Sequence, residues 1–452
     1  MNENTRQRIH SWSDYFIKTV ILLVIGALMG IVVSFFEVIF GYGLVFASRI
    51  HAWAGSWWLL SLPLIGVLIV WMFQKYGGLS RKGMNLVFEV SAGQEQRIPK
   101  RTIPLMTLAT WMSHIAGASV GREGVGMQIG AAVSSFFNRH LPHFVKDKTV
   151  FLIAGMAAGF AGLFGTPFTA VIFAMEVMVS GVIEFRALAP SISAAFFASW
   201  MAGLMGLGKE AYPLSVTLEF SLTRQGLALL VMGVLFGLCG GLFAFTLRKS
   251  HQLTEKWINN PIRRILILSI PLALLLWIGL DGRYCGSGAN LIDAASTGGL
   301  IYWSDPILKF ILTIFSLSIG FVGGEVTPLF AIGSTFGALV APLLGLSPAL
   351  GAALGYAAVF GAGTNTWLAP MVIGMEIFGW NLFPFIFIVC SIASLTNGNL
   401  SIYSRQRKLR GAYLLNDEQT HRYGLELTLS TGLIPPEKSE QNEPIPQDKD
   451  EI

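Results

Sequence analysis

Long apolar stretches, separated by short polar and basic segments, recur along almost the whole chain. They cover Thr19–Phe36, Trp57–Phe73, Pro104–Val120, Thr149–Val182, Ala187–Leu207 and Gly226–Leu247, followed by Ile265–Leu280, Ile307–Val322, Thr327–Phe360 and Trp367–Leu395. A helix that spans a bilayer needs about 20 apolar residues. Several stretches are shorter, and others are interrupted by Gly or Pro. We therefore predict an all-α integral membrane protein with tilted, broken and partly crossing helices that line an internal cavity.

Composition supports a membrane protein and excludes other classes. Of 452 residues, 53% are hydrophobic and 13% charged, against roughly 25% charged in soluble domains. The mean hydropathy is +0.61. A soluble enzyme, a disordered scaffold and a nucleic-acid-binding protein are poor fits. Cys239, Cys285 and Cys390 form neither a metal-binding spacing nor a disulfide framework, so we expect no metal and no cofactor.

Basic clusters between the apolar stretches predict the orientation in the membrane. They lie at Arg97–Arg101, Arg248–Arg264 and Arg405–Arg410. The positive-inside rule places them on the cytoplasmic side, together with both termini. The first apolar run is longer than the core of a cleavable signal, so we interpret it as a membrane helix. The expected location is the cell (inner) membrane, crossed several times.

Three pairs of similar segments occur in the same order in the two halves of the chain. The pairs are Gly83–Val87 with Gly288–Ile292, Gly121–Gly124 with Gly323–Glu325, and Phe173–Val177 with Ile373–Ile377. They indicate an internal duplication, and in transporters the substrate site lies between such repeats, among broken helices. We predict an N-terminal segment 1–14, membrane repeats 15–215 and 216–411, and a polar, disordered cytoplasmic tail 412–452.

The first candidate site is the glycine-rich segment from Gly117 to Gly130, which contains Glu123. If a helix begins here, its free N–H groups and the positive end of its dipole form an anion site. A carboxylate can compete with a small anion for that place, and protonation would release it. The result is a gate coupled to protons. The alternative is a helix-packing motif in which Glu123 pairs with Arg122.

The second candidate is the segment from Gly323 to Pro328. Pro328 suits the first turn of a helix, so the N–H groups near Val326 and Thr327 could face an anion. An apolar setting favours the neutral form of Glu325, which can donate a hydrogen bond. The alternative is an acid at an ordinary helix start.

Other residues have an ordinary interpretation beside the functional one. Met84 is by default core filler, and Tyr403 either reaches an anion or anchors the chain at the membrane interface. Glu176 and Glu376 either carry protons or pair with a neighbour or backbone group. His114 is interpreted as a core histidine.

At these residues the sequence resembles the CLC family of chloride channels and anion/proton antiporters. Gly121–Gly124, followed by Ile129 and Gly130, is similar to the gating-glutamate motif of that family, and the resemblance covers roughly residues 15 to 410. It implies a homodimer with a pore in each subunit, inverted repeats, and an anion held at helix N-termini. Glu123 would be the gate and proton carrier. The implied anion site consists of Met84, Gly124, Val125, Glu325, Val326, Thr327 and Tyr403.

Departures from the common family pattern are informative. Val125 replaces the usual proline, and Met84 stands where a chloride-binding serine is usual. Val177 replaces the second acid of many exchangers, which puts their inner proton route in doubt. These changes resemble the fluoride-exporting branch, in which Glu325 and Thr327 become a fluoride-contacting pair. Small, strongly hydrated fluoride needs short, strong donors, and removing the serine weakens chloride binding.

The sequence therefore predicts a fluoride/proton antiporter, not an enzyme, that exports cytoplasmic fluoride using the inward proton gradient. Its expected partners are fluoride, protons, a second copy of itself and the lipid bilayer, without nucleic acid. The nearest alternative is a chloride/proton exchanger or passive anion channel of the same fold. An intramembrane enzyme using Glu176 and Glu376 lacks an evident nucleophile–base pair. A membrane scaffold would not explain acids and glycines in short helices.

Overall fold

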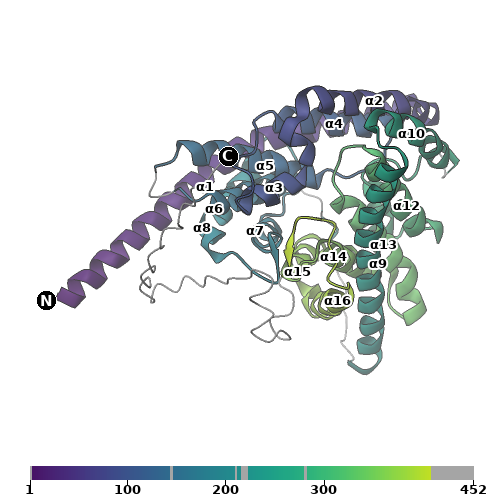
Figure 1. The fold of residues 1–452 in the computed structure, drawn as a ribbon. Helices are drawn as coiled ribbons and strands as arrows, with labels where there is room; N and C mark the ends of the chain where they lie inside the picture. Colours follow the sequence, from purple (N-terminus) through teal and green to yellow (C-terminus); the bar gives the residue numbers. More distant parts are fainter. Residues whose placement is uncertain (1–2, 143–145, 209–210, 215–221, 279–281, 409–452) are drawn as a thin grey trace, which may run out of the picture. The chain divides into compact units, whose positions relative to one another are not determined.

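The structure is a computed structural model that describes residues 3–142, 146–208, 211–214, 222–278 and 282–408 (Figure 1). Its α-helices are α1 (Glu3–Ala54), α2 (Leu62–Met72), α3 (Met84–Ser91), α4 (Thr102–Ala116), α5 (Glu123–His140), α6 (Lys148–Phe164), α7 (Pro167–Glu176), α8 (Leu188–Leu204), α9 (Leu222–Trp257), α10 (Pro261–Ile278), α11 (Ala289–Thr297), α12 (Ser304–Ile319), α13 (Val326–Val340), α14 (Pro348–Thr364), α15 (Leu368–Phe378) and α16 (Phe383–Thr396). The predicted tail 412–452 and the predicted repeat boundary at 215/216 lie outside the described residues.

Short segments connect these helices. The 3-10 and π turns are η1 (Ser56–Ser61), η2 (Phe73–Gly77), η3 (Gly78–Lys82), η4 (Phe185–Ala187), η5 (Ala341–Leu344) and η6 (Trp380–Leu382). Two short strands, β1 (Val179–Ser180) and β2 (Arg407–Lys408), pair in parallel. This pairing ties the last described residues to the middle of the chain.

Helix length separates full spans from partial ones. Within the described residues, six helical segments are long and apolar enough to cross a membrane: Phe16–Ala54, Ser56–Ser91, Phe185–Leu204, Gln225–Trp257, Pro261–Ile278 and Val326–Leu344. Others are much shorter. α7 has 10 residues and rises about 15 Å, half of a hydrocarbon core of about 30 Å. The prediction of an all-α, multi-pass bundle with partly crossing helices is confirmed.

Backbone geometry divides apolar stretches that are continuous in the sequence. The stretch Thr149–Val182 breaks at Gly165, which ends α6 in the left-handed region (φ 67°). Pro167 then begins α7, since proline is well tolerated in a first helical turn. In the second half, η5 and Gly345 (φ 75°) likewise separate α13 from α14. Glycine and proline thus create the broken helices without any loss of hydrophobicity.

Glycines bring two pairs of helices into backbone contact. Between α5 and α6, a Cβ atom added to Gly130 would overlap the carbonyl oxygen of Gly155. Between α13 and α14, a Cβ atom on Gly333 would overlap the carbonyl oxygen of Gly355 in the same way. Membrane helices have little hydrophobic driving force between them, so such close approach through small residues supplies their packing energy.

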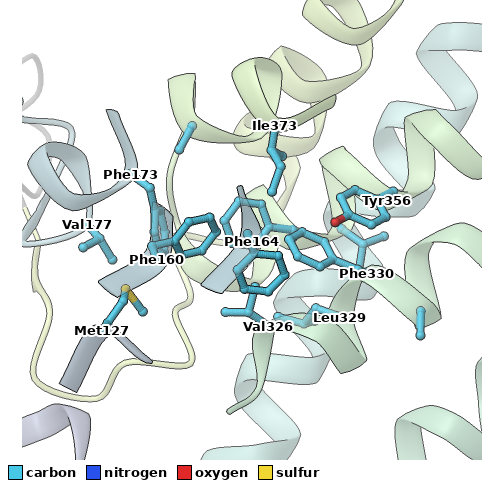
Figure 2. Packing of buried hydrophobic residues seen from close by; sticks show 14 of the residues in the cluster. Met127, Phe160, Phe164, Phe173, Val177, Val326, Leu329, Phe330, Tyr356 and Ile373 are labelled. Carbon is cyan, nitrogen blue, oxygen red and sulfur yellow. The ribbon is translucent and has the colours of Figure 1, made fainter. Parts of the chain in front are cut away.

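Aromatic side chains connect the two halves in one buried core (Figure 2). The ring of Phe173 on α7 lies 5.5 Å from that of Phe160 on α6 and 5.2 Å from that of Phe360 on α14. Phe330 on α13 lies 4.9 Å from Phe360 and stacks on Tyr356 at 3.9 Å. Tilted and stacked ring pairs at these distances stabilise a core beyond the apolar area they bury. The two halves therefore pack as one unit.

Two buried acids cap each other's helices. The Glu176 carboxylate at the end of α7 accepts from the backbone N–H groups of Leu368 (3.0 Å) and Ala369 (2.9 Å) at the start of α15. The Glu376 carboxylate near the end of α15 accepts from the N–H of Thr169 at the start of α7 (2.9 Å). Each acid neutralises the positive end of the opposite helix. The interpretation of both as backbone-paired acids is confirmed.

We predict that Gly130→Ala destabilises the protein by about 1–3 kcal/mol, because the added methyl group forces α5 away from α6. The matched control is Gly203→Ala on α8, where a Cβ atom meets nothing within 4 Å. Thermal unfolding of the purified variants in detergent would show a lower midpoint for Gly130→Ala alone. Equal midpoints would mean that the close approach carries no packing energy.

Candidate functional site

The N-termini of α5 and α13 meet at a short antiparallel bridge. The N–H of Gly121 donates to the carbonyl of Gly324 (2.6 Å), and the N–H of Gly324 donates to the carbonyl of Gly121 (2.9 Å). We call residues 121–124 and 324–327 the helix junction. Two sets of N–H groups without partners inside their own helices and two positive helix ends converge there, which favours negative charge. The junction joins two motifs that lie about 200 residues apart in the sequence.

Glu123 occupies this junction with its own carboxylate. The side chain is completely buried. Its Oε2 accepts from the N–H of Thr327 (2.9 Å) on α13 and from the N–H of Arg122 (3.1 Å). Its Oε1 lies 3.8 Å from Nε of Arg122, a longer ion pair. The carboxylate thus takes the position in which a bound anion would accept hydrogen bonds from both helices.

Two glycines that carry no side chain keep the junction open. A Cβ atom on Gly324 would lie 2.9 Å from the amide nitrogens of Glu123 and Gly124. On Gly121 it would lie 2.7 Å from Oε2 of Glu123. Any larger residue would therefore fill the place of the carboxylate. Sequence reasoning did not include these two residues in the site, although both belong to the motifs that it compared.

A cavity of about 650 Å³ adjoins the junction, and we call it the inner cavity. Among the predicted anion-site residues, Met84, Val125, Glu325 and Tyr403 line it. Its polar and charged lining residues include Gln74, Arg81, Lys82, Asn85, Gln128, Arg248, His251, Gln252, Glu255, Arg264 and Ser404. Glu123, Gly124, Val326 and Thr327 do not line the cavity. The predicted residues are thus divided between the cavity and the junction beside it.

Two buried hydroxyl groups lie at the cavity or beside it. The hydroxyl oxygens of Tyr403 and Thr327 are buried and have no hydrogen-bond partner among the described residues. Glu325 is partly buried, precedes α13 as its N-cap residue and faces the cavity. Met84 is the first residue of α3 and is 9% exposed. Buried donors without partners are costly, so this end of the cavity suits a ligand that accepts hydrogen bonds.

The first-turn N–H groups of the junction are not equivalent. The N–H of Val125 already donates to the carbonyl of Arg122 (3.1 Å) inside α5. Gly124 and Val326 lie in the first turn of their helices, where backbone donors lack partners within the helix. Gln128, one turn further along α5, donates to the carbonyl of Gly124 (2.9 Å) and lines the cavity. Sequence reasoning missed Gln128 because a single glutamine on a helix has no motif.

Two helix N-termini converge around a buried acid inside a multi-pass membrane bundle. This arrangement is typical of proteins that bind or transport ions. The chain belongs to the voltage gated chloride channel family, whose model matches residues 65–398. Over 358 residues it is 33% identical to a chloride/fluoride channel protein of Pseudomonas syringae pv. tomato, and the match covers 78% of each chain. This is a family of channels and transporters.

Solved structures agree. A crystal structure of a CLC-type fluoride/proton antiporter is 42% identical, with a TM-score of 0.84 and coverage of 86% of this chain and 98% of that chain. A slow cyanobacterial Cl⁻/H⁺ antiporter is 19% identical, with a TM-score of 0.70 and coverage of 85% and 96%, and shares the fold. The resemblance to the CLC family and its fluoride-exporting branch, based on the motifs, is confirmed, as is the CLC-like fold.

We predict that Gly324→Ala lowers anion flux about tenfold or more, because a methyl group 2.9 Å from two junction amides excludes an anion. Flux is measured with the purified protein in liposomes. Gly208→Ala, where a Cβ atom meets nothing within 4 Å, serves as the control. Flux at the control rate from a correctly folded Gly324→Ala protein would show that anions do not pass the junction.

Proposed function

We propose that the chain is a fluoride/proton antiporter that exports cytoplasmic fluoride and is driven by the inward proton gradient. The observation that carries this proposal is the buried Glu123 carboxylate, which accepts hydrogen bonds from the junction N–H groups of Arg122 and Thr327. The 42% identical relative, described as a fluoride/proton antiporter, supports the choice of ions. The main alternative is a chloride/proton exchanger or a passive anion channel of the same fold, and the relative described as a chloride/fluoride channel protein favours the channel form of this alternative.

The proposed cycle follows from competition at the junction. Ionised Glu123 occupies the N–H groups and keeps an anion out. Protonation removes the negative charge, so the carboxyl loses its attraction to the two positive helix ends. An anion from the inner cavity then takes the vacated position, and Glu123 moves away with its proton. Ionised Glu123 and an anion exclude each other from the same N–H donors. Fluoride export is therefore linked to proton movement in the opposite direction.

Fluoride selectivity is assigned to Glu325, Thr327 and Met84. A neutral Glu325 carboxyl and the Thr327 hydroxyl provide O–H donors, and O–H donors to an anion form the shortest and strongest hydrogen bonds. The Thr327 oxygen has no other partner among the described residues. Met84 presents a thioether, a weak acceptor that offers chloride no hydroxyl donor. The difference between the two affinities sets the specificity.

The inner cavity is assigned to the cytoplasmic side. Arg81, Lys82, Arg248 and Arg264 line it, and basic residues beside membrane helices are typical of that side. Their positive potential raises the local concentration of small anions. In this arrangement both termini are cytoplasmic, the chain resides in the cell (inner) membrane, and fluoride enters from the cytoplasm.

The assembly and the division of the chain are also part of the proposal. Residues 15–215 and 216–411 are assigned as inverted repeats. Two matched features support this assignment. The contact of α5 with α6 repeats in that of α13 with α14, and Glu176 and Glu376 cap each other's helices.

The proposed assembly is a homodimer in which each subunit holds its own pore. Transport needs no chemical conversion of fluoride, so the protein is not assigned as an enzyme.

Flux from liposomes tests the proposed function, and Glu123→Gln provides the internal comparison. We predict that the wild type releases fluoride with coupled proton uptake and little chloride, followed by two ion-selective electrodes and a pH electrode. The amide of Glu123→Gln cannot ionise, so proton movement is lost while the side chain keeps its size. Chloride release at a rate comparable to that of fluoride would indicate a general anion exchanger. Fluoride flux without proton movement would indicate a channel. Proton movement in the Glu123→Gln variant would exclude the gate role of Glu123.

We predict that Glu325→Gln lowers fluoride turnover about tenfold or more, because a neutral amide N–H is a weaker donor to fluoride than a carboxyl O–H. Glu184→Gln is the control, since Glu184 forms an exposed ion pair with Arg186 and such pairs contribute little. Both variants are compared by initial fluoride efflux at equal protein density. An unchanged rate in Glu325→Gln would reduce Glu325 to a structural role.

A further inference from the structure

A second acid, Glu37, lies buried beside the helix that begins with Glu123. It is on α1, and its side chain is completely buried. Neither of its carboxyl oxygens has a hydrogen-bond partner, and it forms no ion pair, within the part of the chain that the structure describes. An ionised carboxylate without partners in that position is strongly unfavourable, whereas a carboxyl that carries a proton avoids most of this cost. Acids inside a membrane bundle are rarely retained without a function.

Two glycines on neighbouring helices make room for this side chain. A Cβ atom on Gly162 of α6 would lie 3.3 Å from Cγ of Glu37. A Cβ atom on Gly126 of α5 would lie 3.0 Å from its Oε2. The side chain thus extends from α1 past α6 and ends against α5, and these helices lie beside one another (Figure 1). A Cβ atom at Gly126 would press on the carboxyl group, and one at Gly162 would press on its Cγ.

The position on α5 connects Glu37 with the gate. Gly126 is three residues after Glu123 on the same helix. Residues three apart are neighbours on a helix surface and differ by about 4.5 Å along the axis. A Glu123 side chain that leaves the N–H of Thr327 is therefore within one helical turn of the Glu37 carboxyl.

Few other titratable or charged groups lie on the elements packed against Glu37. Over their described lengths, α8 and η1 have no charged residue, and α6 has only Lys148 in its first turn. On α4 the nearest titratable group is His114, whose Nδ1 is hydrogen-bonded to the carbonyl of Thr110 (2.9 Å). On α5 it is Glu123.

Two other buried acids of the bundle, Glu176 and Glu376, differ from Glu37. The carboxylates of Glu176 and Glu376 already accept several backbone N–H groups. Those bonds hold both carboxyl groups in place. Glu37 has no such bonds, so its buried carboxyl favours the form that carries a proton.

We propose that Glu37 is a proton-binding site of the transport cycle, which receives the proton that Glu123 carries. This rests on the proposed antiport. Glu37 first releases its own proton toward the cytoplasm and is then a carboxylate. The O–H bond of protonated Glu123 breaks, a new O–H bond forms on Glu37, and Glu123 is left as the carboxylate that returns to the junction. One proton thus leaves Glu37 for the cytoplasm, a second passes from Glu123 to Glu37, and no other group changes.

The test compares proton uptake and fluoride efflux in liposomes for Glu37→Gln and the wild type. Gln has the same size and cannot exchange a proton, so we expect coupled proton uptake to fall tenfold or more. Fluoride affinity, measured by isothermal titration calorimetry, should stay within twofold of wild type. Ser34→Ala is the control, because Ser34 lies one turn earlier on α1 and its hydroxyl donates to the carbonyl of Ile31 in the same helix. Wild-type proton uptake in Glu37→Gln would overturn the proposal.

A second variant covers the case in which Glu37→Gln does not fold. Glu37→Asp keeps a carboxyl group that ends one methylene further from α5. Proton-coupled efflux should persist with a shifted pH–rate profile, and an unchanged profile would contradict a proton-binding role.

Failure of this inference is distinct from failure of the proposed function. In the first case the wild type couples protons and Glu37 does not matter, and in the second the wild type moves no protons at all.

Discussion

The junction of two helix N-termini is the constraint on which the rest of the structure depends. At the Gly121–Gly324 bridge, the N-termini of α5 and α13 meet, and their first-turn backbone donors lack partners within their own helices. Burying such donors in a membrane is costly unless something accepts from them. Glu123 accepts from the opposite helix at 2.9 Å and so satisfies part of this demand. The same demand makes the junction a place where an anion can replace the carboxylate.

The surrounding bundle holds this junction in place by contacts that repeat in both halves. Glycines let α5 approach α6 and α13 approach α14 to backbone contact, which fixes the directions of the two helices that form the junction. Behind them, the aromatic core from Phe160 to Tyr356 joins the halves (Figure 2). Glu176 and Glu376 secure the adjacent α7 and α15 in the same reciprocal manner. Rigid helices are what an anion site with short hydrogen bonds requires.

The sequence predicted most of the fold and the local parts of the site, but not how distant parts meet. Apolar stretches identified the membrane bundle, and the glycine-flanked acids marked two segments in which helices could begin and carried the resemblance to the family. The bond from Thr327 to Glu123 spans 204 residues, and no local pattern contains it. The break at Gly165 was hidden because apolar residues continue across it. Glu37 was not selected, since a single acid in an apolar run carries no motif and its meaning depends on Gly126 and Gly162.

The central claim is that the Glu123 carboxylate and a fluoride ion compete for the same junction N–H groups. It is tested most directly by isothermal titration calorimetry of fluoride binding to Glu123→Ala and to the wild type at neutral pH. The account predicts that removing the carboxylate exposes a fluoride site that the wild type lacks, seen as additional bound fluoride per subunit. Identical stoichiometry and affinity in the two proteins would contradict it.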